Sequence, residues 1–222
     1  MTAPAQPPKR SIGRAILRSA LGLGLFAVVT AGIVAGTRAL TAERIADNRQ
    51  ASEYRMLREV LPEELRDVPI ETLLDNVVTL PASEAVGQRQ LFRGWRIESS
   101  EKTVLIMPVV ATGGYSGDIH LLVGIDQQGR VTGVRVTRHQ ETPGLGDKIE
   151  RRKSDWITRF NGRSLEDPAS GNWAVTKDGG EFDAFTGATI TPRAVVRAVK
   201  RSLEYVEAER SALFQADQEN QP

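Results

Sequence analysis

Two β-strands joined by a tight turn are predicted from the stretch Ile119-His-Leu-Leu-Val-Gly-Ile-Asp-Gln-Gln-Gly-Arg-Val-Thr-Gly-Val-Arg-Val-Thr-Arg138. Apolar and β-branched residues fill both halves, and Asp126-Gln-Gln-Gly129 between them has the composition of a hairpin turn. Three further strand candidates precede this hairpin, at Asn76–Leu80, Leu91–Ile97 and Thr103–Ala111. We therefore expect one mainly antiparallel sheet built from strands that follow each other in the chain.

Helical patterns flank this block of strands on both sides. Before it, helix formers fill Thr41 to about Leu61, and Pro62 ends the segment. After it, a helix is expected from Pro192 to about Glu207, with one apolar face. That face consists of Val195, Val199, Leu203 and Val206. A run of strands with helices at both ends predicts an α+β fold and not a doubly wound sheet.

Shorter segments between the last strand and this helix have weaker patterns. Residues 145–160 are expected to form a helix or irregular turn. We expect extended pieces at Trp173–Val175 and Glu181–Phe185, on either side of a turn at Lys177-Asp-Gly-Gly180. From Ser211 onward the polar composition predicts a tail outside the domain.

A long apolar segment precedes the domain. Ser19 to Thr37 contains no charged residue and, as a helix, measures about 28 Å, close to the ~30 Å hydrocarbon core of a bilayer. No acidic residue occurs before Glu43, whereas four basic residues precede the segment: Lys9, Arg10, Arg14 and Arg18. The positive-inside rule then predicts a single-pass membrane protein with a cytoplasmic N-terminus. In a Gram-negative cell the helix would span the inner membrane and the domain would lie in the periplasm. The alternative is a cleaved signal peptide, with Val34-Ala-Gly36 as the cleavage site.

These patterns divide the chain into five expected parts. They are a basic cytoplasmic N-terminus (1–18), a transmembrane helix (19–38), a helical connector (39–75), the α+β domain (76–210) and the polar tail (211–222).

Composition excludes several classes of function. The net charge of +1 argues against a nucleic-acid-binding protein. Because the chain has no cysteine, it has no disulfide, no thiolate-bound zinc or iron–sulfur cluster and no covalent c-type haem. With only His120 and His139, a multi-histidine metal site is not expected either. No Rossmann fingerprint is present, so direct NAD(H) binding is not expected. A P-loop and a G-x-S-x-G elbow are absent as well.

A glycine-containing turn precedes the last predicted helix, in the stretch Asp183-Ala-Phe-Thr-Gly-Ala-Thr-Ile-Thr191. Thr191 suits the N-cap and Pro192 the first helical position, so free backbone N–H groups and the helix dipole would favour an anion there. The hydroxyls of Thr186 and Thr189 bracket Gly187-Ala188, where small residues allow a bulky group to approach the backbone. The residues alone leave two interpretations, an anion site or an ordinary turn with a capped helix.

The same turn resembles the D-x-x-[ST]-G-A-T motif of bacterial FMN-binding domains, with no departure from it. In that family a flavin transferase joins FMN through its phosphate to the threonine that closes the motif. The resemblance implies that Thr189 is the acceptor, with Thr191 as a competing one. It also implies that Asp183 binds the metal of the transferase or orients the acceptor; an exposed acidic residue without a role is the alternative.

Two further segments resemble one family in the same order. His139-Gln-Glu-Thr-Pro-Gly-Leu-Gly146 is similar to the H-x-E-T-P-G-L-G segment of RnfG, the G component of the Rnf electron-transport complex. The related C component of the Na⁺-translocating NADH:quinone reductase, NqrC, contains the same segment. Gly113-Gly-Tyr-Ser-Gly-Asp118 resembles a strand entry seen in both. Together with the N-terminal apolar segment, the three matches cover most of the chain.

The resemblance implies an electron relay with FMN attached by a phosphoester. Proteins of this family belong to an ion-translocating complex that transfers electrons between ferredoxin and NAD, and are not catalytic alone. The expected partners are the other membrane and iron–sulfur subunits and, during maturation, the flavin transferase; we expect no freely diffusing substrate. The alternatives are NqrC of the quinone reductase, a membrane-anchored FMN-binding regulatory module, and an inert scaffold with an unmodified motif.

The flavin ring is expected to lie against the second motif. Its wall would consist of Tyr115 together with Glu141, Thr142, Pro143, Gly144, Leu145 and Gly146. Pro143 stiffens this loop, and its two glycines allow close backbone approach. The alternatives are a plain surface turn for the loop and a core position for Tyr115. A redox role for His139 and a proton-accepting role for Glu141 are open, against a satisfied surface histidine and a structural or solvated carboxylate.

Overall fold

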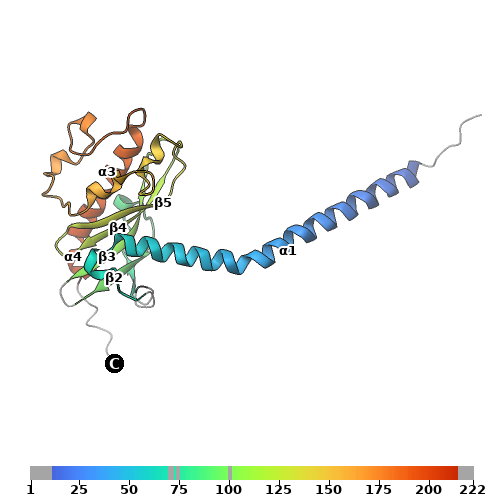
Figure 1. The fold of residues 1–222 in the computed structure, drawn as a ribbon, viewed down its shortest axis with the longest axis horizontal. Helices are drawn as coiled ribbons and strands as arrows, with labels where there is room; N and C mark the ends of the chain where they lie inside the picture. The colour runs from blue at the N-terminus through green and yellow to red at the C-terminus, as the bar shows by residue number, and fades with distance from the viewer. Residues whose placement is uncertain (1–11, 70–72, 74–75, 100–101, 215–222) are drawn as a thin grey trace, which may run out of the picture. The chain divides into compact units, whose positions relative to one another are not determined.

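The computed structural model describes residues 12–69, 73, 76–99 and 102–214 (Figure 1). It separates into two compact units, Met1–Ser52 and Glu53–Pro222. Lys9, Arg10 and the last eight residues of the expected tail, 215–222, lie outside the described residues.

Helix α1 (Ile12–Val60) is one continuous helix. Its segment Ile16–Ala42 is 27 residues long with a mean hydropathy of 2.0, and is long and apolar enough to cross a membrane. The expected membrane helix and connector helix therefore form a single element. The residues between them do not break a helix, and the Thr37 and Thr41 hydroxyls each donate a hydrogen bond of 2.8 Å to a carbonyl one turn earlier.

The second unit contains a five-stranded antiparallel sheet in the order β1-β2-β3-β4-β5. The strands are β1 (Val77–Leu80), β2 (Phe92–Glu98), β3 (Thr103–Ala111), β4 (Ile119–Asp126) and β5 (Val131–Arg138). The hairpin turn forms as predicted: Gly129 has a φ of 75°, and the Asp126 carboxylate accepts from the N–H groups of Gln128 and Arg130. The expected α+β fold is confirmed.

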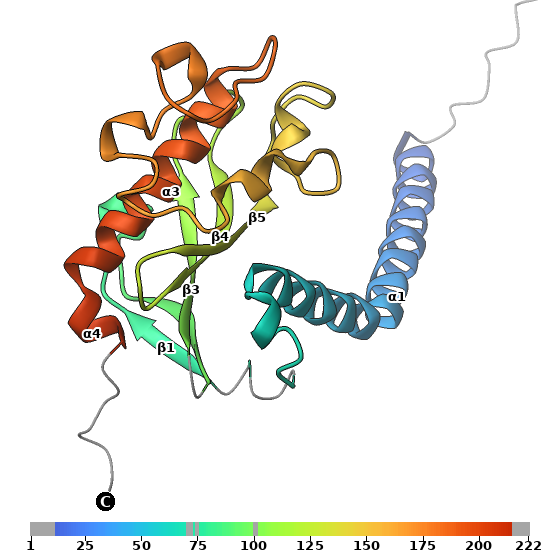
Figure 2. The same cartoon turned by 60° about the vertical axis from the view of Figure 1, so that its left-hand side comes forward.

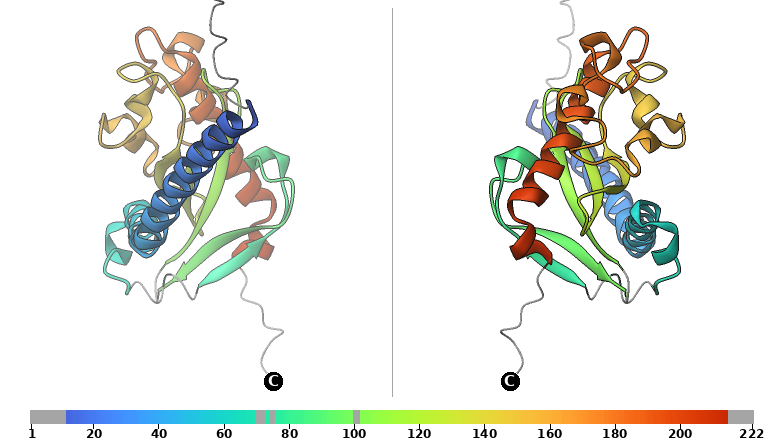
Figure 3. Two further views of the ribbon diagram at one scale, coloured as in Figure 1. Left: turned by 90° about the vertical axis from the view of Figure 1, so that its right-hand side faces the viewer. Right: turned by 90° about the vertical axis from the view of Figure 1, so that its left-hand side faces the viewer.

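Apolar residues cover both faces of this sheet. On β3, Leu105, Met107 and Val109 belong to one buried cluster, whereas the alternating Val104 and Ile106 belong to another. Helix α3 (Ile190–Ala208) packs its predicted apolar face into the first cluster (Figure 2). The second cluster contains the last turns of α1 and the short helix η1 (Glu63–Leu65), on the opposite side of the strands (Figure 3). The 3-10 helix η2 (Glu84–Val86) adds Val86 to the first cluster.

The end of α1 sits in a notch made by two glycines. A Cβ atom at Gly133 would lie 2.8 Å from Val60 Cα, and one at Gly124 would lie 2.5 Å from Val60 Cγ1. The last carbonyls of a helix have no partner within the helix. Here the Val60 carbonyl accepts a hydrogen bond of 2.8 Å from the Thr132 hydroxyl. The two glycines therefore allow helix backbone to approach strand backbone closely.

Four 3-10 helices connect β5 to α3: η3 (Gly146–Ile149), η4 (Asp155–Phe160), η5 (Ser170–Asn172) and η6 (Thr176–Asp178). The two expected extended pieces form no strand: one isolated bridge joins Val175 to Phe182, and another joins Phe185 to Ala188 in the following turn. Aromatic side chains hold this region together instead, with ring centroids 4.7 Å apart for Phe160 and Phe182 and 5.1 Å for Trp156 and Phe185.

The expected start of the last long helix and the expected start of the tail are both wrong. Helix α3 begins at Ile190, so Thr189 is its N-cap residue and makes no side-chain capping bond, while Thr191 lies buried in the first turn. Thr191 does not cap the helix because its hydroxyl is used in a tertiary hydrogen bond, described below. Helix α4 (Arg210–Phe214) replaces the start of the predicted tail, because Leu213 is buried in the main core.

The glycine notch makes a testable prediction. Gly133→Ala should destabilise the domain by about 1–3 kcal/mol, because the new methyl group overlaps the Val60 backbone. The measurement is denaturant-induced unfolding of the full chain in detergent. Gly171→Ala is the matched control, since a Cβ there meets no atom within 4 Å; an equal effect of both substitutions would contradict the notch.

Candidate functional site

The three sequence motifs meet at the buried carboxylate of Glu141. The side chain is 4% exposed, although it follows the last strand in an otherwise open loop. Its Oε1 accepts from the Ser116 N–H at 3.0 Å, in the β3–β4 loop, and its Oε2 accepts from the Thr191 hydroxyl on α3. One side chain thus joins segments 25 and 50 residues away.

Two motif glycines make room for this carboxylate. A Cβ at Gly114 would lie 2.8 Å from Glu141 Oε1, and one at Gly146 would lie 2.9 Å from both Glu141 Oε2 and Thr191 Oγ1. Gly146 is predicted to allow close approach of a flavin ring. In the structure, the direction in which a side chain at Gly146 would point is filled by the Glu141 and Thr191 side chains.

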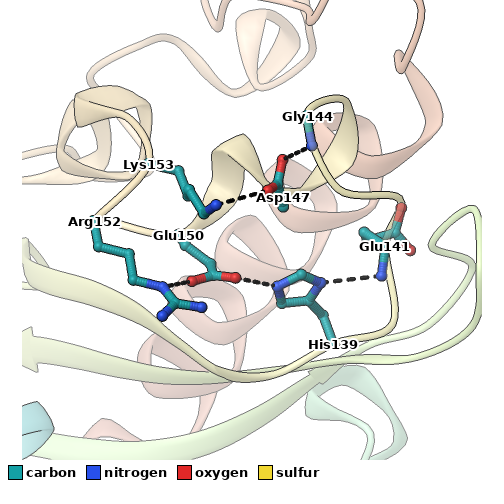
Figure 4. Close-up of polar contacts among 7 residues, drawn as sticks. All are labelled: His139, Glu141, Gly144, Asp147, Glu150, Arg152 and Lys153. Atoms are coloured by element: carbon teal, nitrogen blue, oxygen red, sulfur yellow. Dashed lines mark hydrogen bonds and ion pairs between the residues drawn. The ribbon is translucent and has the colours of Figure 1, made fainter.

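His139 orients the same loop (Figure 4). The Glu141 N–H donates to His139 Nδ1 at 3.0 Å, so the ring proton lies on Nε2, which donates to Glu150 Oε1 at 2.8 Å. Arg152 binds the other Glu150 oxygen, and it is the main reason, before His139, that the pKa of Glu150 is below its ordinary value. Both ring nitrogens are engaged within the loop, which supports a positioning role for His139 and not a redox role.

A second buried carboxylate, Asp147, fixes the tip of the loop (Figure 4). It accepts from the Gly144 N–H at 2.8 Å and lies 3.4 Å from Lys153 Nζ. Gly144 has a φ of 78°, which favours glycine. The turn is completed by the Thr142 carbonyl, which accepts from the N–H groups of Leu145 and Gly146 at 3.2 and 3.1 Å. Thr142, Pro143, Gly144 and Leu145 are all exposed.

The threonine motif forms a separate turn. Gly187 has a φ of 80°, and the Ala188 N–H closes the turn on the Phe185 carbonyl at 3.1 Å. Trp156 anchors the turn, because its indole N–H donates to the Asp183 carbonyl at 2.8 Å and its ring packs against Phe185. The exposed Asp183 carboxylate lies 3.6 Å from Arg159. Thr186, also exposed, occupies the tip of the turn next to Gly187.

Thr189 ends this motif with a half-buried side chain. Its Oγ1 accepts a hydrogen bond of 3.0 Å from Lys177 Nζ, in helix η6. Arg193, one turn further along α3, makes two bonds of 2.6 and 2.8 Å to the Asp178 carboxylate. Lys177 is not among the predicted site residues. Its place in a predicted turn, 12 residues before Thr189, is the only feature of the sequence that points to it.

The glutamate motif and the threonine motif adjoin each other. A Cβ at Gly187 would lie 3.7 Å from Leu145 Cδ2, so the two turns are in van der Waals reach. Leu145 and the neighbouring Ile190 are 42% and 44% exposed, and Tyr115 is 69% exposed. The interpretation of Tyr115 as a core aromatic is therefore wrong. Each of the three segments presents an exposed apolar side chain, and Ile190 was not predicted as part of the site.

Comparison with known proteins assigns the family. The G component of the ion-translocating oxidoreductase complex of Pseudomonas aeruginosa is 45% identical over 206 residues, which cover 90% of this chain and 93% of that protein. The same component from Vibrio vulnificus is 43% identical over 209 residues, 94% of this chain and 95% of that protein. The chain belongs to the RnfG family. Family models for the RnfG N-terminal region and the FMN-binding domain match residues 1–60 and 114–204.

A solved structure has the same fold. The crystal structure of the C component of the Na⁺-translocating NADH-quinone reductase from Parabacteroides distasonis aligns with a TM-score of 0.53. The alignment covers 80% of this chain and 98% of that one, at 15% sequence identity. Identity this low shows the fold alone, so the more similar relatives assign this chain to the RnfG family and not to the quinone-reductase component.

The residues around Thr189 fit FMN, the ligand of the matched domain. The half-buried hydroxyl has an ammonium group 3.0 Å away, which suits a phosphate. Leu145, within van der Waals reach of Gly187, and Ile190 in the first turn of α3 both present exposed apolar surface, which suits a flat ring. Within the described residues no group of three or more His, Cys, Asp or Glu side chains is placed to hold a metal ion.

The buried carboxylate makes a second prediction. Glu141→Ala should lower the free energy of unfolding by roughly 2–4 kcal/mol, because it leaves the Ser116 N–H and the Thr191 hydroxyl without an acceptor. Glu166→Ala, an exposed carboxylate in the same unit, should change it by less than about 0.5 kcal/mol. Both values come from denaturant unfolding of the full chain. A Glu141→Ala variant as stable as the control would show that the carboxylate does not hold the three segments together.

Proposed function

We propose that this protein relays electrons through FMN bound covalently to Thr189, within an ion-translocating oxidoreductase complex. The observation that carries the proposal is the Thr189 hydroxyl, which closes the Asp183-Ala-Phe-Thr-Gly-Ala-Thr189 motif inside the matched FMN-binding region and lies 3.0 Å from an ammonium group. FMN, when bound, supplies one- and two-electron transfer. The protein's own residues attach, orient and enclose it.

Thr189 is the better acceptor of the two candidate threonines. Thr191 is fully buried and its hydroxyl donates to Glu141, so it is neither accessible nor free. In the transfer, Thr189 Oγ1 bonds to the FMN phosphorus. The bond from that phosphorus to the leaving phosphate of an activated flavin nucleotide breaks, and the hydroxyl proton passes to the transferase. Asp183 is exposed two residues before the turn, where the transferase would reach it.

Covalent attachment has a physical reason here. A phosphate at a helix N-terminus gains only about 0.3–1 kcal/mol, or ~2 kcal/mol when partly buried. The apolar side chains at the site, those of Tyr115, Leu145 and Ile190, are all exposed, so their contacts with a ring would stay open to solvent. A carrier that depended on these contacts would lose its flavin to the surrounding solution, whereas a phosphodiester bond prevents dissociation.

The acceptor is tested by substitution. Thr189→Val removes the hydroxyl and retains the side-chain shape. After co-expression with a flavin transferase, we expect this variant to lose all denaturation-resistant flavin fluorescence and the FMN-sized mass increase on its Thr189 peptide. Thr186→Val, at the exposed tip of the same turn, should keep both. Full fluorescence in Thr189→Val would contradict the assignment.

The relay role is tested in the assembled complex. Its partners are the other subunits, and we propose that iron–sulfur and membrane subunits exchange electrons with this flavin. A complex that contains Thr189→Val should assemble but lose electron transfer between ferredoxin and NAD, whereas Thr186→Val should retain it. Normal transfer by the Thr189→Val complex would indicate a regulatory or structural module.

We also propose that the N-terminus is cytoplasmic and the domain periplasmic. The segment Ile16–Ala42 would span the inner membrane once. Arg14 precedes it and no acidic residue occurs before Glu43, which is the charge asymmetry of a cytoplasmic flank.

The absence of cysteine allows a direct test of this orientation. Single cysteines are introduced at two exposed positions, as Gly13→Cys before the apolar segment and Glu166→Cys in the domain. A membrane-impermeant maleimide should label Glu166→Cys in spheroplasts and Gly13→Cys only after lysis. The reverse pattern would contradict the orientation, and loss of the Gly13→Cys site from the mature protein would indicate a cleaved signal peptide.

A further inference from the structure

Lys177 is a cation without a counter-charge, directed at the acceptor hydroxyl. Its Nζ donates to Thr189 Oγ1 at 3.0 Å, and the side chain is otherwise exposed. Among the described residues, no carboxylate lies within ion-pair distance of it. The neighbouring Arg193 differs, because its Nε and Nη2 are both bound to Asp178.

The backbone around Lys177 is built to hold it there. Helix η6 ends at Asp178, and its C-cap Gly179 has a φ of 83° and donates to the Thr176 carbonyl at 3.1 Å. Gly180 follows with no room for a side chain, since a Cβ would lie 2.0 Å from the Ala174 carbonyl oxygen. The turn can therefore pass close to the preceding segment and present Lys177 outward.

An ion pair clamps this turn to α3. The Asp178 carboxylate accepts two bonds from Arg193, and these bonds hold the pKa of Asp178 below its ordinary value. The backbone N–H of Arg193 donates to the Thr189 carbonyl at 3.2 Å. Lys177 and Thr189 are thus connected to the same helix end through adjacent residues, which keeps the ammonium next to the hydroxyl.

The charges around Thr189 leave a positive charge uncompensated. Arg193 is paired with Asp178, and Arg197 adds a further positive charge near that carboxylate, whereas Lys177 has only the uncharged Thr189 hydroxyl as a partner. A phosphodiester on that hydroxyl carries a negative charge, which is opposite in sign to the Lys177 ammonium. A charge-assisted N–H···O bond to such an anion is stronger than the present bond to a neutral hydroxyl.

We propose that Lys177 is the phosphate-binding cation of this site: it holds the phosphate of the incoming flavin during transfer and neutralises the phosphodiester afterwards. The proposal rests on the proposed attachment of FMN at Thr189. It assigns a positioning role to a residue outside all three sequence motifs.

The test compares three variants of the full chain in detergent. Lys177→Met removes the charge and keeps the length, Lys177→Arg keeps the charge, and Arg201→Met removes an exposed cation elsewhere on α3. Each is mixed with a purified flavin transferase and a limiting flavin donor. The initial rate of loading is followed by in-gel fluorescence, and thermal unfolding shows that each variant is folded.

We expect loading of Lys177→Met to be slower by roughly tenfold or more, the loss typical of one charge-assisted hydrogen bond. Lys177→Arg should remain within about threefold of the wild type, and Arg201→Met should be unchanged. The wild-type rate should also fall with added salt, whereas the Lys177→Met rate should be flat, because salt screens a charge interaction and not a steric one. The ³¹P resonance of the loaded protein should shift only in Lys177→Met.

Contrary outcomes are separable. If the wild type loads at Thr189 but Lys177→Met loads equally fast with the same salt dependence, only the role of Lys177 is overturned. Equal slowing of Lys177→Met and Lys177→Arg would indicate that the shape of the side chain matters, which also overturns the charge assignment. A wild-type chain that remains unmodified at Thr189 overturns the proposed function and this inference together.

Discussion

The buried carboxylate of Glu141 is the constraint on which the rest of the site depends. A carboxylate removed from water is stable only if donors replace the lost solvent, and here the Ser116 N–H and the Thr191 hydroxyl do so. Because these donors come from the β3–β4 loop and from α3, satisfying one side chain fixes two distant segments. Gly114 and Gly146 follow from the same constraint, since a methyl group at either position would overlap the carboxylate.

A second layer of contacts orients the loops without touching Thr189. His139, whose other nitrogen is bound to Glu150, accepts from the backbone N–H of Glu141, and Asp147 accepts from that of Gly144. Trp156 holds the carbonyl of Asp183 on the other side. A site whose turns are each tied to buried or partly buried side chains has little freedom to rearrange. Such rigidity suits the proposed role, in which a bound flavin exchanges electrons with fixed neighbours.

The sheet and the last helix were predictable because their signal is local. Strands β1 to β5 and the apolar face of α3 each repeat with the period of their secondary structure, and the structure confirms them. The errors lie where tertiary contacts decide. Thr191 has the composition of an N-cap but is drawn into the core by Glu141, and the short helix α4 forms because Leu213 finds a buried position. Helix α1 is continuous because no residue between the two predicted helical segments breaks a helix, so the sequence marks no boundary there.

The sequence by itself determined the positions of the strands, the apolar N-terminal segment and the threonine motif, since each is encoded in consecutive residues. Only the tertiary structure decided what surrounds that threonine. Glu141 is predicted as part of a wall for the flavin ring, and the structure shows it as a buried connector. Lys177 is predicted only as part of a turn, and the structure places its ammonium beside the Thr189 hydroxyl. The physical reason is the same in both cases. A buried carboxylate and a directed ammonium are defined by partners many residues away, and no local pattern records which distant groups the folded chain brings into hydrogen-bond range.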